Sequence, residues 1–172
     1  VVCTVPRVPV LLCFADCVPV VICAPGGFAV AHSGWRGTIA RIAGKAARAL
    51  AEEACCATAE LSAYVGPHIG SADYEVSADL LARFVAEFGP GVDAGQRHLD
   101  LGRAVCDALV DAGVPRTAIA TCDDSTASNV GRFFSYRAEA GHCGRHGALA
   151  VLGSDARAGW RGLPAAGGDG VA

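Results

Sequence analysis

The fold is decided by the stretch PVLLCFADCVPVVICAPGGFAVAHSGWRG, residues 9–37, in which apolar runs of strand length alternate with turn residues. Pro9–Phe14 and Val18–Cys23 are continuous apolar runs, which predict strands buried on both faces. The Pro-Gly-Gly segment at 25–27 predicts a turn, and Phe28–His32 predicts the next strand. The chain therefore begins with a group of strands that should form the core of a sheet.

Downstream of this stretch, helical and strand patterns alternate. Helices are predicted at Thr38–Cys55, Ser77–Phe88 and Asp100–Ala112, with Thr38 and Asp100 as N-caps and Gly113 as a stop signal. Strands are predicted at Leu61–Val65, Ala118–Cys122 and Ala148–Leu152, and an extended aromatic segment at Arg132–Arg137. This alternation predicts one α/β domain over residues 1–152, followed by a flexible Gly- and Ala-rich tail over 153–172.

Composition excludes several classes of protein. The chain has 172 residues, of which 52% are hydrophobic and 18% charged, so a disordered protein is excluded. The net charge of −3 gives no basic face for nucleic acid. Asp16, prolines and glycines interrupt the apolar runs well before they reach the length that spans a membrane. We therefore expect a soluble protein without a nucleic-acid or membrane partner. No pattern in the sequence specifies an oligomeric state.

The cysteine content and the first residues of the chain indicate the cellular compartment of the protein. Nine cysteines are an odd number, and most lie in apolar segments, where cysteine behaves as a small buried hydrophobe. No signal peptide precedes the first apolar run. These features predict a reducing, cytoplasmic environment. The absence of methionine, even at position 1, predicts a processed or truncated chain, or the product of a gene fragment.

Cys17 and His32 are the first candidates for chemistry. Cys17 follows one predicted strand and precedes another, whereas His32 ends the third. If these strands are neighbours, both side chains lie at one edge of the sheet, where ligand sites of α/β folds form. A thiol and an imidazole in contact can be two metal ligands or a nucleophile and its base. A buried cysteine beside a hydrogen-bonded histidine is the alternative without function.

The turn after His32 adds groups that suit a ligand. His-Ser-Gly-Trp-Arg-Gly, residues 32–37, places an aromatic ring and a guanidinium between glycines, which let the backbone approach a ligand closely. Arg36 can bind phosphate or carboxylate with two hydrogen bonds. The start of the following helix offers free N–H groups to an anion. Trp35 can stack on a base or simply pack.

Taken together, these residues resemble the signature of the multicopper polyphenol oxidoreductase (laccase-domain) proteins, also described as purine nucleoside phosphorylases of the YfiH/YlmD type. The resemblance runs in ordered blocks from residue 3 to residue 152. The two most specific blocks are Phe14–Val20 and Ala31–Gly37. The others are Tyr64–Gly70, Tyr74–Val76, His98–Leu101, Cys122, Phe133–Arg137 and Gly144–Arg145.

The resemblance implies a compact α/β fold of the cysteine-hydrolase-like kind, with β-sheets packed between helices. It also implies a zinc site of two histidines and one cysteine, in which copper is the alternative ion. Two of the ligands match Cys17 and His32. The third belongs to an upstream Gln-x-His-Gly segment that this chain lacks. Because a catalytic zinc normally has three protein ligands, the site in this chain is expected to be incomplete.

The implied activity is phosphorolysis of adenosine, inosine, guanosine and methylthioadenosine, together with adenosine deamination. The partners are then purine nucleosides and phosphate. In this interpretation Cys17 and His32 hold the metal. Asp16 orients a ligand or relays protons, and Arg36 orients phosphate. The residues expected to bind the nucleoside are Trp35, Ser135, Tyr136 and Arg137.

The sequence leaves three other functions open. A copper-dependent polyphenol oxidase needs many histidine ligands, and the chain has five histidines. Cys17 as nucleophile with His32 as base would instead make a cysteine hydrolase. A chain without its first metal ligand would be an inactive domain or a partner-binding module.

Overall fold

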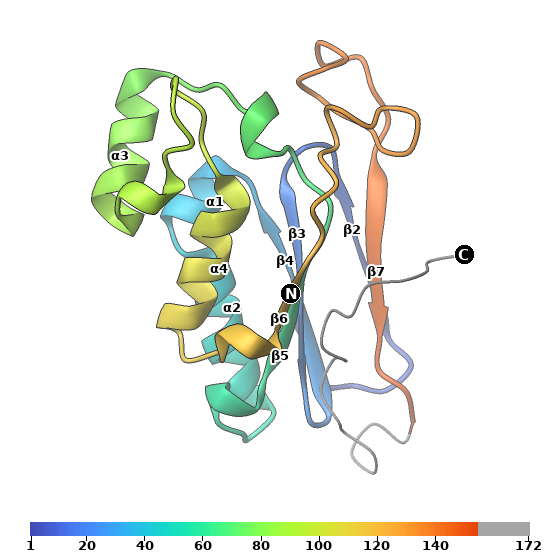
Figure 1. Cartoon of the computed structure of the whole chain (residues 1–172). Coiled ribbons are helices and arrows are strands. Elements are labelled where there is room, and N and C mark those ends of the chain that lie inside the picture. Colours follow the sequence, from blue (N-terminus) through green and yellow to red (C-terminus); the bar gives the residue numbers. More distant parts are fainter. Residues whose placement is uncertain (155–172) are drawn as a thin grey trace.

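The computed structural model describes residues 1–154, and its central layer is a five-stranded sheet (Figure 1). The strand order is β1-β4-β3-β5-β6, with all neighbours antiparallel except the parallel pair β5–β6. The strands are β1 (Val2–Cys3), β3 (Val18–Ala24), β4 (Gly27–Ser33), β5 (Ser62–Val65) and β6 (Ile119–Thr121). Two of the three predicted early strands, β3 and β4, therefore lie in this sheet, whereas the first, Pro9–Phe14, belongs to a different sheet.

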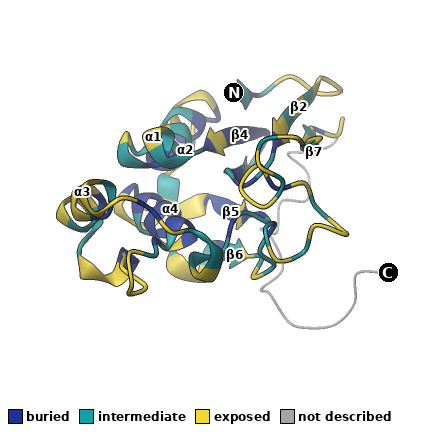
Figure 2. Cartoon of the chain, turned by 90° about the horizontal axis from the view of Figure 1, so that it is seen from above, coloured by how far each residue is buried: buried dark blue, intermediate teal, exposed yellow. Residues whose placement is uncertain are grey.

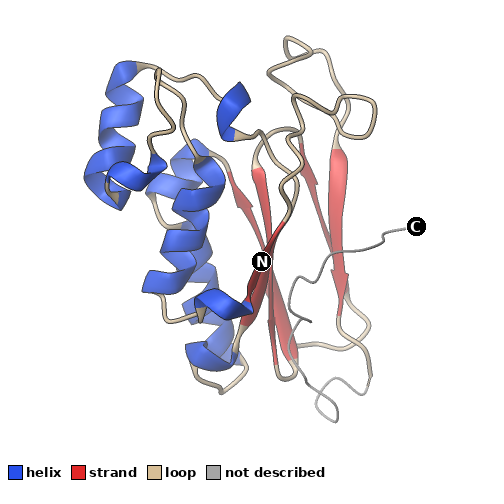
Figure 3. Ribbon diagram, in the orientation of Figure 1, coloured by secondary structure: helices blue, strands red, loops and turns tan. Residues whose placement is uncertain are grey.

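The helices lie together on one face of the central sheet (Figure 3). They are α1 (Trp35–Ile39), α2 (Ile42–Glu53), α3 (Ala78–Phe88) and α4 (Leu101–Asp111), with short 3₁₀ turns at Thr58–Glu60, Ser71–Asp73, Pro90–Val92 and Arg116–Ala118. The larger hydrophobic core fills the space between them and the sheet, and includes Ile22, Leu50 and Leu109. Seen from above, the buried residues follow this boundary (Figure 2).

A second sheet covers the opposite face of the central sheet. It consists of β2 (Pro9–Phe14) and β7 (His146–Val151), paired antiparallel. The α/β class predicted from the sequence is confirmed, and the helices lie on one side only, with the second sheet in place of a second helical layer. Between the two sheets is a smaller core of Phe28, Val30 and Leu152.

The outer face of the second sheet is apolar and exposed. Leu11, Leu149 and Val151 are 58%, 66% and 57% exposed. The prediction that Pro9–Phe14 is buried on both faces is therefore wrong for β2. Its partner is β7 at the far end of the chain, and no described residue covers the outside of this pair. In contrast, Val18–Ala24 is largely buried, as predicted.

The starts of the helices show which boundaries are set by the local sequence and which by contacts with distant residues. Asp100 caps α4 as predicted, since its Oδ1 accepts the Arg103 N–H at 2.8 Å. The predicted helix Thr38–Cys55 is wrong at its start, because helix begins at Trp35 and is broken at Arg41 (φ +56°). The Arg41 guanidinium is held there by ion pairs with side chains from α3 and α4.

Two further predictions concern the last part of the chain. Arg132–Arg137 forms turns and irregular backbone, so the predicted extended segment is wrong. The final strand begins two residues earlier than predicted, at His146. Of the predicted tail 153–172, the part from residue 155 lies outside the described residues.

Candidate active site

The first half of the site is the turn between β2 and β3, where the chain crosses from the outer sheet to the central one. Asp16 lies in this turn at φ +75°, a region that non-glycine residues rarely adopt. Cys17 comes next and immediately precedes β3. Because β3 and β4 pair with Pro19 opposite His32, the thiol and the imidazole lie at the same end of the sheet. The predicted neighbourhood of these strands is confirmed.

The second half of the site is the turn from β4 into α1. The Thr38 hydroxyl, at 2.8 Å from Ser33 Oγ and 3.0 Å from the Gly34 carbonyl oxygen, fixes this turn. Cys17 Sγ packs directly on Gly34, where it occupies the space of a side chain. The helix that begins here has only five residues. The expected helix N-terminus is therefore too short to serve as an anion site, and phosphate binding would depend on Arg36.

These two turns enclose a pocket of about 400 Å³, here called the Cys17–His32 pocket. All five residues predicted from the strand ends and the turn line it: Asp16, Cys17, His32, Trp35 and Arg36. The Arg36 guanidinium lies 4.3 Å from the centre of the Trp35 ring. The pocket thus combines a thiol, an imidazole, an aromatic face and a cation.

A second hollow of about 410 Å³ adjoins this pocket and shares Trp35 and Tyr74 with it. Arg137, predicted to bind the nucleoside, lines this second hollow. Its guanidinium lies 5.2 Å from the Tyr74 ring centre and donates to the Glu75 carbonyl oxygen at 2.9 Å. The two hollows therefore share an aromatic lining.

Ser135 and Tyr136, the other predicted nucleoside ligands, do not line either hollow. Ser135 is fully buried, and its Oγ accepts the Ala138 N–H at 3.0 Å. Tyr136 is 58% exposed and lies beside Arg145. In this structure Ser135 stabilises a turn and Tyr136 lies on the surface.

The electrostatics of the pocket favour neutral side chains. Burial raises the pKa of the Cys17 thiol, the charge of Asp16 raises it further, and Arg145 opposes both. Burial lowers the pKa of His32, against a hydrogen bond with the Cys13 backbone. The His32 ring also stacks on Phe14, with 4.6 Å between ring centres. At neutral pH the pair is therefore a thiol and a neutral imidazole.

Some neighbours of the pocket were not predicted as site residues. Ile69 and Leu101 supply apolar lining from the loop after β5 and the start of α4, and Tyr74 supplies an aromatic face. Tyr74 lies in one of the blocks of the family resemblance, which was the available signal. His146, opposite Phe14 on β7, has both ring nitrogens buried without a hydrogen-bond partner. Ile69 and Leu101 likewise lie in blocks of that resemblance, Tyr64–Gly70 and His98–Leu101, whereas no local pattern in the sequence marks the pairing of His146 with Phe14.

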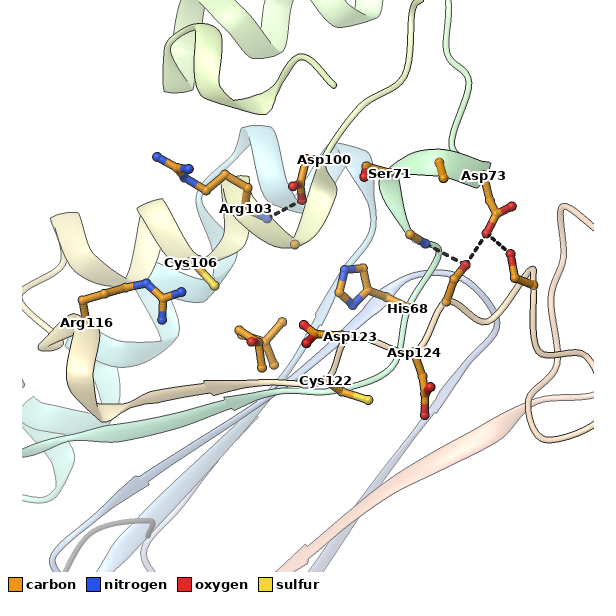
Figure 4. A pocket seen from close by; sticks show the side chains of 17 residues that line it. His68, Ser71, Asp73, Asp100, Arg103, Cys106, Arg116, Cys122, Asp123 and Asp124 are labelled. Atoms are coloured by element: carbon orange, nitrogen blue, oxygen red, sulfur yellow. Dashed lines mark hydrogen bonds between the residues drawn. The ribbon is translucent and has the colours of Figure 1, made fainter. Parts of the chain in front are cut away.

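A separate cavity of about 430 Å³ is lined by residues that include parts of the loop after β5, α4 and the loop after β6 (Figure 4). His68, Asp100 and Asp123 are among its lining residues. Ile69 and Leu101, the chain neighbours of His68 and Asp100, face the Cys17–His32 pocket instead. The loop after β5 and the start of α4 thus form a shared wall between the two spaces.

The side chains of Cys17 and His32 are of types that bind metal ions. Sulfur and imidazole nitrogen are preferred zinc ligands, and Cys17 and His32 line one pocket. Within residues 1–154, however, no three His, Cys, Asp or Glu side chains are grouped to hold an ion. The described residues therefore fit two positions of the implied zinc site, one fewer than a catalytic zinc normally has.

The arrangement defines an α/β protein with a cysteine–histidine pocket at the end of a mixed sheet. Residues 1–153 match the family model described as multi-copper polyphenol oxidoreductase laccase, and the chain belongs to that family. The resemblance stated from the sequence is thereby confirmed. No helix within residues 1–154 has the length and apolar character needed to cross a membrane.

Several curated proteins and solved structures are similar to the chain. A purine nucleoside phosphorylase of Staphylococcus saprophyticus is 33% identical over 156 residues, covering 86% of this chain and 57% of that protein. Purine nucleoside phosphorylase YlmD of Geobacillus stearothermophilus is 34% identical over 151 residues, covering 83% and 54%.

The crystal structure of YlmD from Geobacillus stearothermophilus superposes with a TM-score of 0.82 at 30% identity, covering 89% of this chain and 60% of that one. The hypothetical protein YfiH of Bacillus licheniformis gives a TM-score of 0.82 at 28% identity, covering 88% and 60%. The chain therefore spans a little more than half the length of these relatives.

Proposed function

We propose that the chain carries the active site of a purine nucleoside phosphorylase, which transfers the ribosyl group of a purine nucleoside to phosphate. The observation that carries this proposal is the convergence of Cys17, His32, Trp35 and Arg36 on one pocket. Relatives named purine nucleoside phosphorylase support it. The expected substrates are adenosine, inosine, guanosine and methylthioadenosine.

Phosphate recognition is assigned to Arg36. No carboxylate pairs with Arg36 among the ion pairs of the described residues, whereas Arg41, Arg97, Arg103 and Arg132 are each paired. Its guanidinium is held over the Trp35 ring, so it can bind an oxyanion with two hydrogen bonds at little further entropic cost. Oriented in this way, a phosphate oxygen attacks ribose C1′ while the bond from C1′ to the purine nitrogen breaks.

The purine base is assigned to the aromatic pair shared by the two hollows. Trp35 and Tyr74 offer ring faces on which a base can stack, and Arg137 borders the adjoining hollow. Stacking positions the nucleoside so that the ribose extends toward Arg36. Ser135 and Tyr136, which lie outside both hollows, are assigned no contact in this arrangement.

Zinc is proposed as the metal, with Cys17 and His32 as two of its ligands and copper as the alternative ion. When bound, the ion would lower the pKa of a coordinated water and supply the hydroxide that adenosine deamination needs at the purine C6. The neutral His32 ring is ready to donate a lone pair, because burial already lowers its pKa. A third ligand would have to come from outside residues 1–154.

Three alternatives make different predictions. A cysteine hydrolase needs a thiolate at neutral pH, and burial raises the pKa of Cys17 rather than lowering it. Stoichiometric inactivation by iodoacetamide that EDTA leaves unchanged would favour that alternative. Stoichiometric copper with oxygen uptake on a phenol would favour a polyphenol oxidase. An inactive domain would bind neither metal nor nucleoside.

The test is turnover of inosine and phosphate by the 172-residue chain, with zinc quantified in the same sample and a full-length relative of 33% identity assayed beside it. Cys17→Ser and His32→Gln should abolish turnover, and both should lower the zinc content. Turnover with about one zinc per chain would support the proposal. Zinc-loaded chain without release of hypoxanthine, beside an active relative, would overturn it.

A further inference from the structure

A buried hydrogen bond ties the turn that carries Cys17 to a distant loop. The Thr126 hydroxyl donates to Asp16 Oδ1 at 2.7 Å, across 110 residues of sequence. Thr126 is fully buried and Asp16 is 9% exposed. A carboxylate buried in this way requires hydrogen-bond donors, because it has lost water. Within residues 1–154, Thr126 supplies the one donor to this carboxylate that comes from a side chain.

The turn itself requires support. Asp16 has φ +75°, and a non-glycine residue stays in this region only when its surroundings hold it there. Two backbone N–H groups help: Arg137 donates to Asp16 Oδ2 at 2.7 Å, and Ile69 donates to the Asp16 carbonyl oxygen at 3.0 Å. Three hydrogen bonds from two loops, the one after β5 and the long one between β6 and β7, thus converge on one residue. Only the Thr126 contact can be removed by changing a single side chain.

The position of the Cys17 thiol depends on this turn. Its sulfur packs against Gly34 so closely that there is no space for a Cβ between them. A small rotation at Asp16 would move the sulfur away from the pocket that it shares with His32. Both oxygens of the Asp16 carboxylate are already engaged. The geometry therefore favours a role for Asp16 in orientation over one in proton relay.

We propose that Thr126 is a positioning residue of the Cys17–His32 pocket. Through its hydrogen bond to Asp16, it holds the left-handed turn that sets the place of the Cys17 sulfur. Thr126 does not line that pocket, so it acts through Asp16. The kinetic part of this inference rests on the phosphorolysis proposed above, whereas the placement of the thiol does not.

The test compares Thr126→Val, which keeps the shape and loses the donor, with Thr126→Ser, which keeps the donor. Alkylation of each cysteine by iodoacetamide is followed by mass spectrometry at one pH, with EDTA in every sample. In Thr126→Val, Cys17 should react about threefold faster relative to Cys56, because the thiol leaves its site against Gly34. Phosphorolysis should lose about tenfold or more in kcat, with KM for inosine little changed. Thr126→Ser should restore both properties.

Ser77→Ala is the control for a general loss of stability. It removes the cap of α3, where Ser77 Oγ accepts the Leu80 N–H, and it leaves the Asp16 turn untouched. Its Cys17 alkylation rate should match that of the parent chain. Unchanged Cys17 alkylation in Thr126→Val would overturn the proposal, as would a Thr126→Ser variant that behaves like Thr126→Val. If the parent chain shows no phosphorolysis, the proposed function fails, and alkylation still decides the role of Thr126.

Discussion

Gly34 and Cys17 are in direct contact: a Cβ atom on residue 34 would lie 2.8 Å from the Cys17 sulfur. Gly34 has φ −79°, so its backbone is available to any residue. The glycine is therefore required by the neighbouring thiol and not by the turn. This contact explains why a small residue stands between the histidine and the tryptophan of the site.

Gly34→Ala should displace the Cys17 sulfur while leaving the fold intact. Because catalytic groups tolerate little displacement, we expect about tenfold or greater loss of phosphorolysis and a lower zinc content. The melting temperature should change by no more than a few degrees, because alanine fits the backbone conformation. Gly131→Ala is the matched control, since its Cβ would meet no atom within 4 Å. Full activity and zinc content in Gly34→Ala would contradict the assigned position of Cys17.

Arg36→Ala should weaken phosphate binding selectively. Loss of a bidentate guanidinium contact should raise the KM for phosphate about tenfold or more. The rate of adenosine deamination, which uses no phosphate, should change far less. Arg83→Ala is the control, because Arg83 also lies over the Trp35 ring, at 5.8 Å, without lining the pocket. Equal losses in both activities would show that Arg36 does not bind phosphate.

The strand pattern was predictable because each strand of the early group is an uninterrupted apolar run between turn residues. The position of α4 was predictable because Asp100 is a local cap. The break at Arg41 was not, because its left-handed backbone is held by carboxylates 46 and 70 residues away. The exposed face of β2 was also missed, because its partner β7 lies at the other end of the chain.

The site was predictable where its groups come from adjacent strand ends. Cys17 and His32 lie near the ends of strands joined by a short hairpin, so the sequence brings them together. Thr126 reaches Asp16 from a polar loop with no periodic pattern. Ser135 and Tyr136 were expected in the pocket from the resemblance alone, and the turn around them places both elsewhere. The contacts between distant loops therefore could not be predicted from the sequence, and only the structure shows them.

Gly44→Ala tests whether packing prevails over helix propensity in α2. Alanine is favoured over glycine in a helix interior by about 1 kcal/mol. A Cβ at residue 44, however, would lie 2.6 Å from the Ala108 carbonyl oxygen on α4. Because overpacking of this kind costs about 1–3 kcal/mol, we expect a lower free energy of unfolding in urea. Exposed Lys45→Ala should stay within about 0.5 kcal/mol of the parent. If Gly44→Ala instead raises the free energy of unfolding, α2 and α4 move apart at little cost to accommodate the added methyl group.

His146 should make the fold sensitive to acid. Burial lowers the pKa of His146 below its ordinary value of 6.5, and neither ring nitrogen has a hydrogen-bond partner. Between the lowered pKa and 6.5, the unfolded chain binds more protons than the folded one, so the free energy of unfolding falls as the pH falls. His32 and His68, whose pKa values burial also lowers, act in the same direction. Stability should therefore be fully present above pH 6.5 and decline below it.

His146→Phe separates the contribution of this one ring. Phenylalanine keeps the aromatic contacts with Phe14 and Phe133 and carries no group to protonate. Urea unfolding at a series of pH values from about 7.5 to about 5, the range in which histidine titrates, should give a shallower acid decline for the variant. At pH 7.5 the variant should be as stable as the parent or more so, because no hydrogen bond is lost. If the free energy of unfolding of both proteins declines equally as the pH falls, protonation of His146 costs the folded chain nothing. The His146 ring nitrogens would then have to find hydrogen-bond partners inside the folded chain.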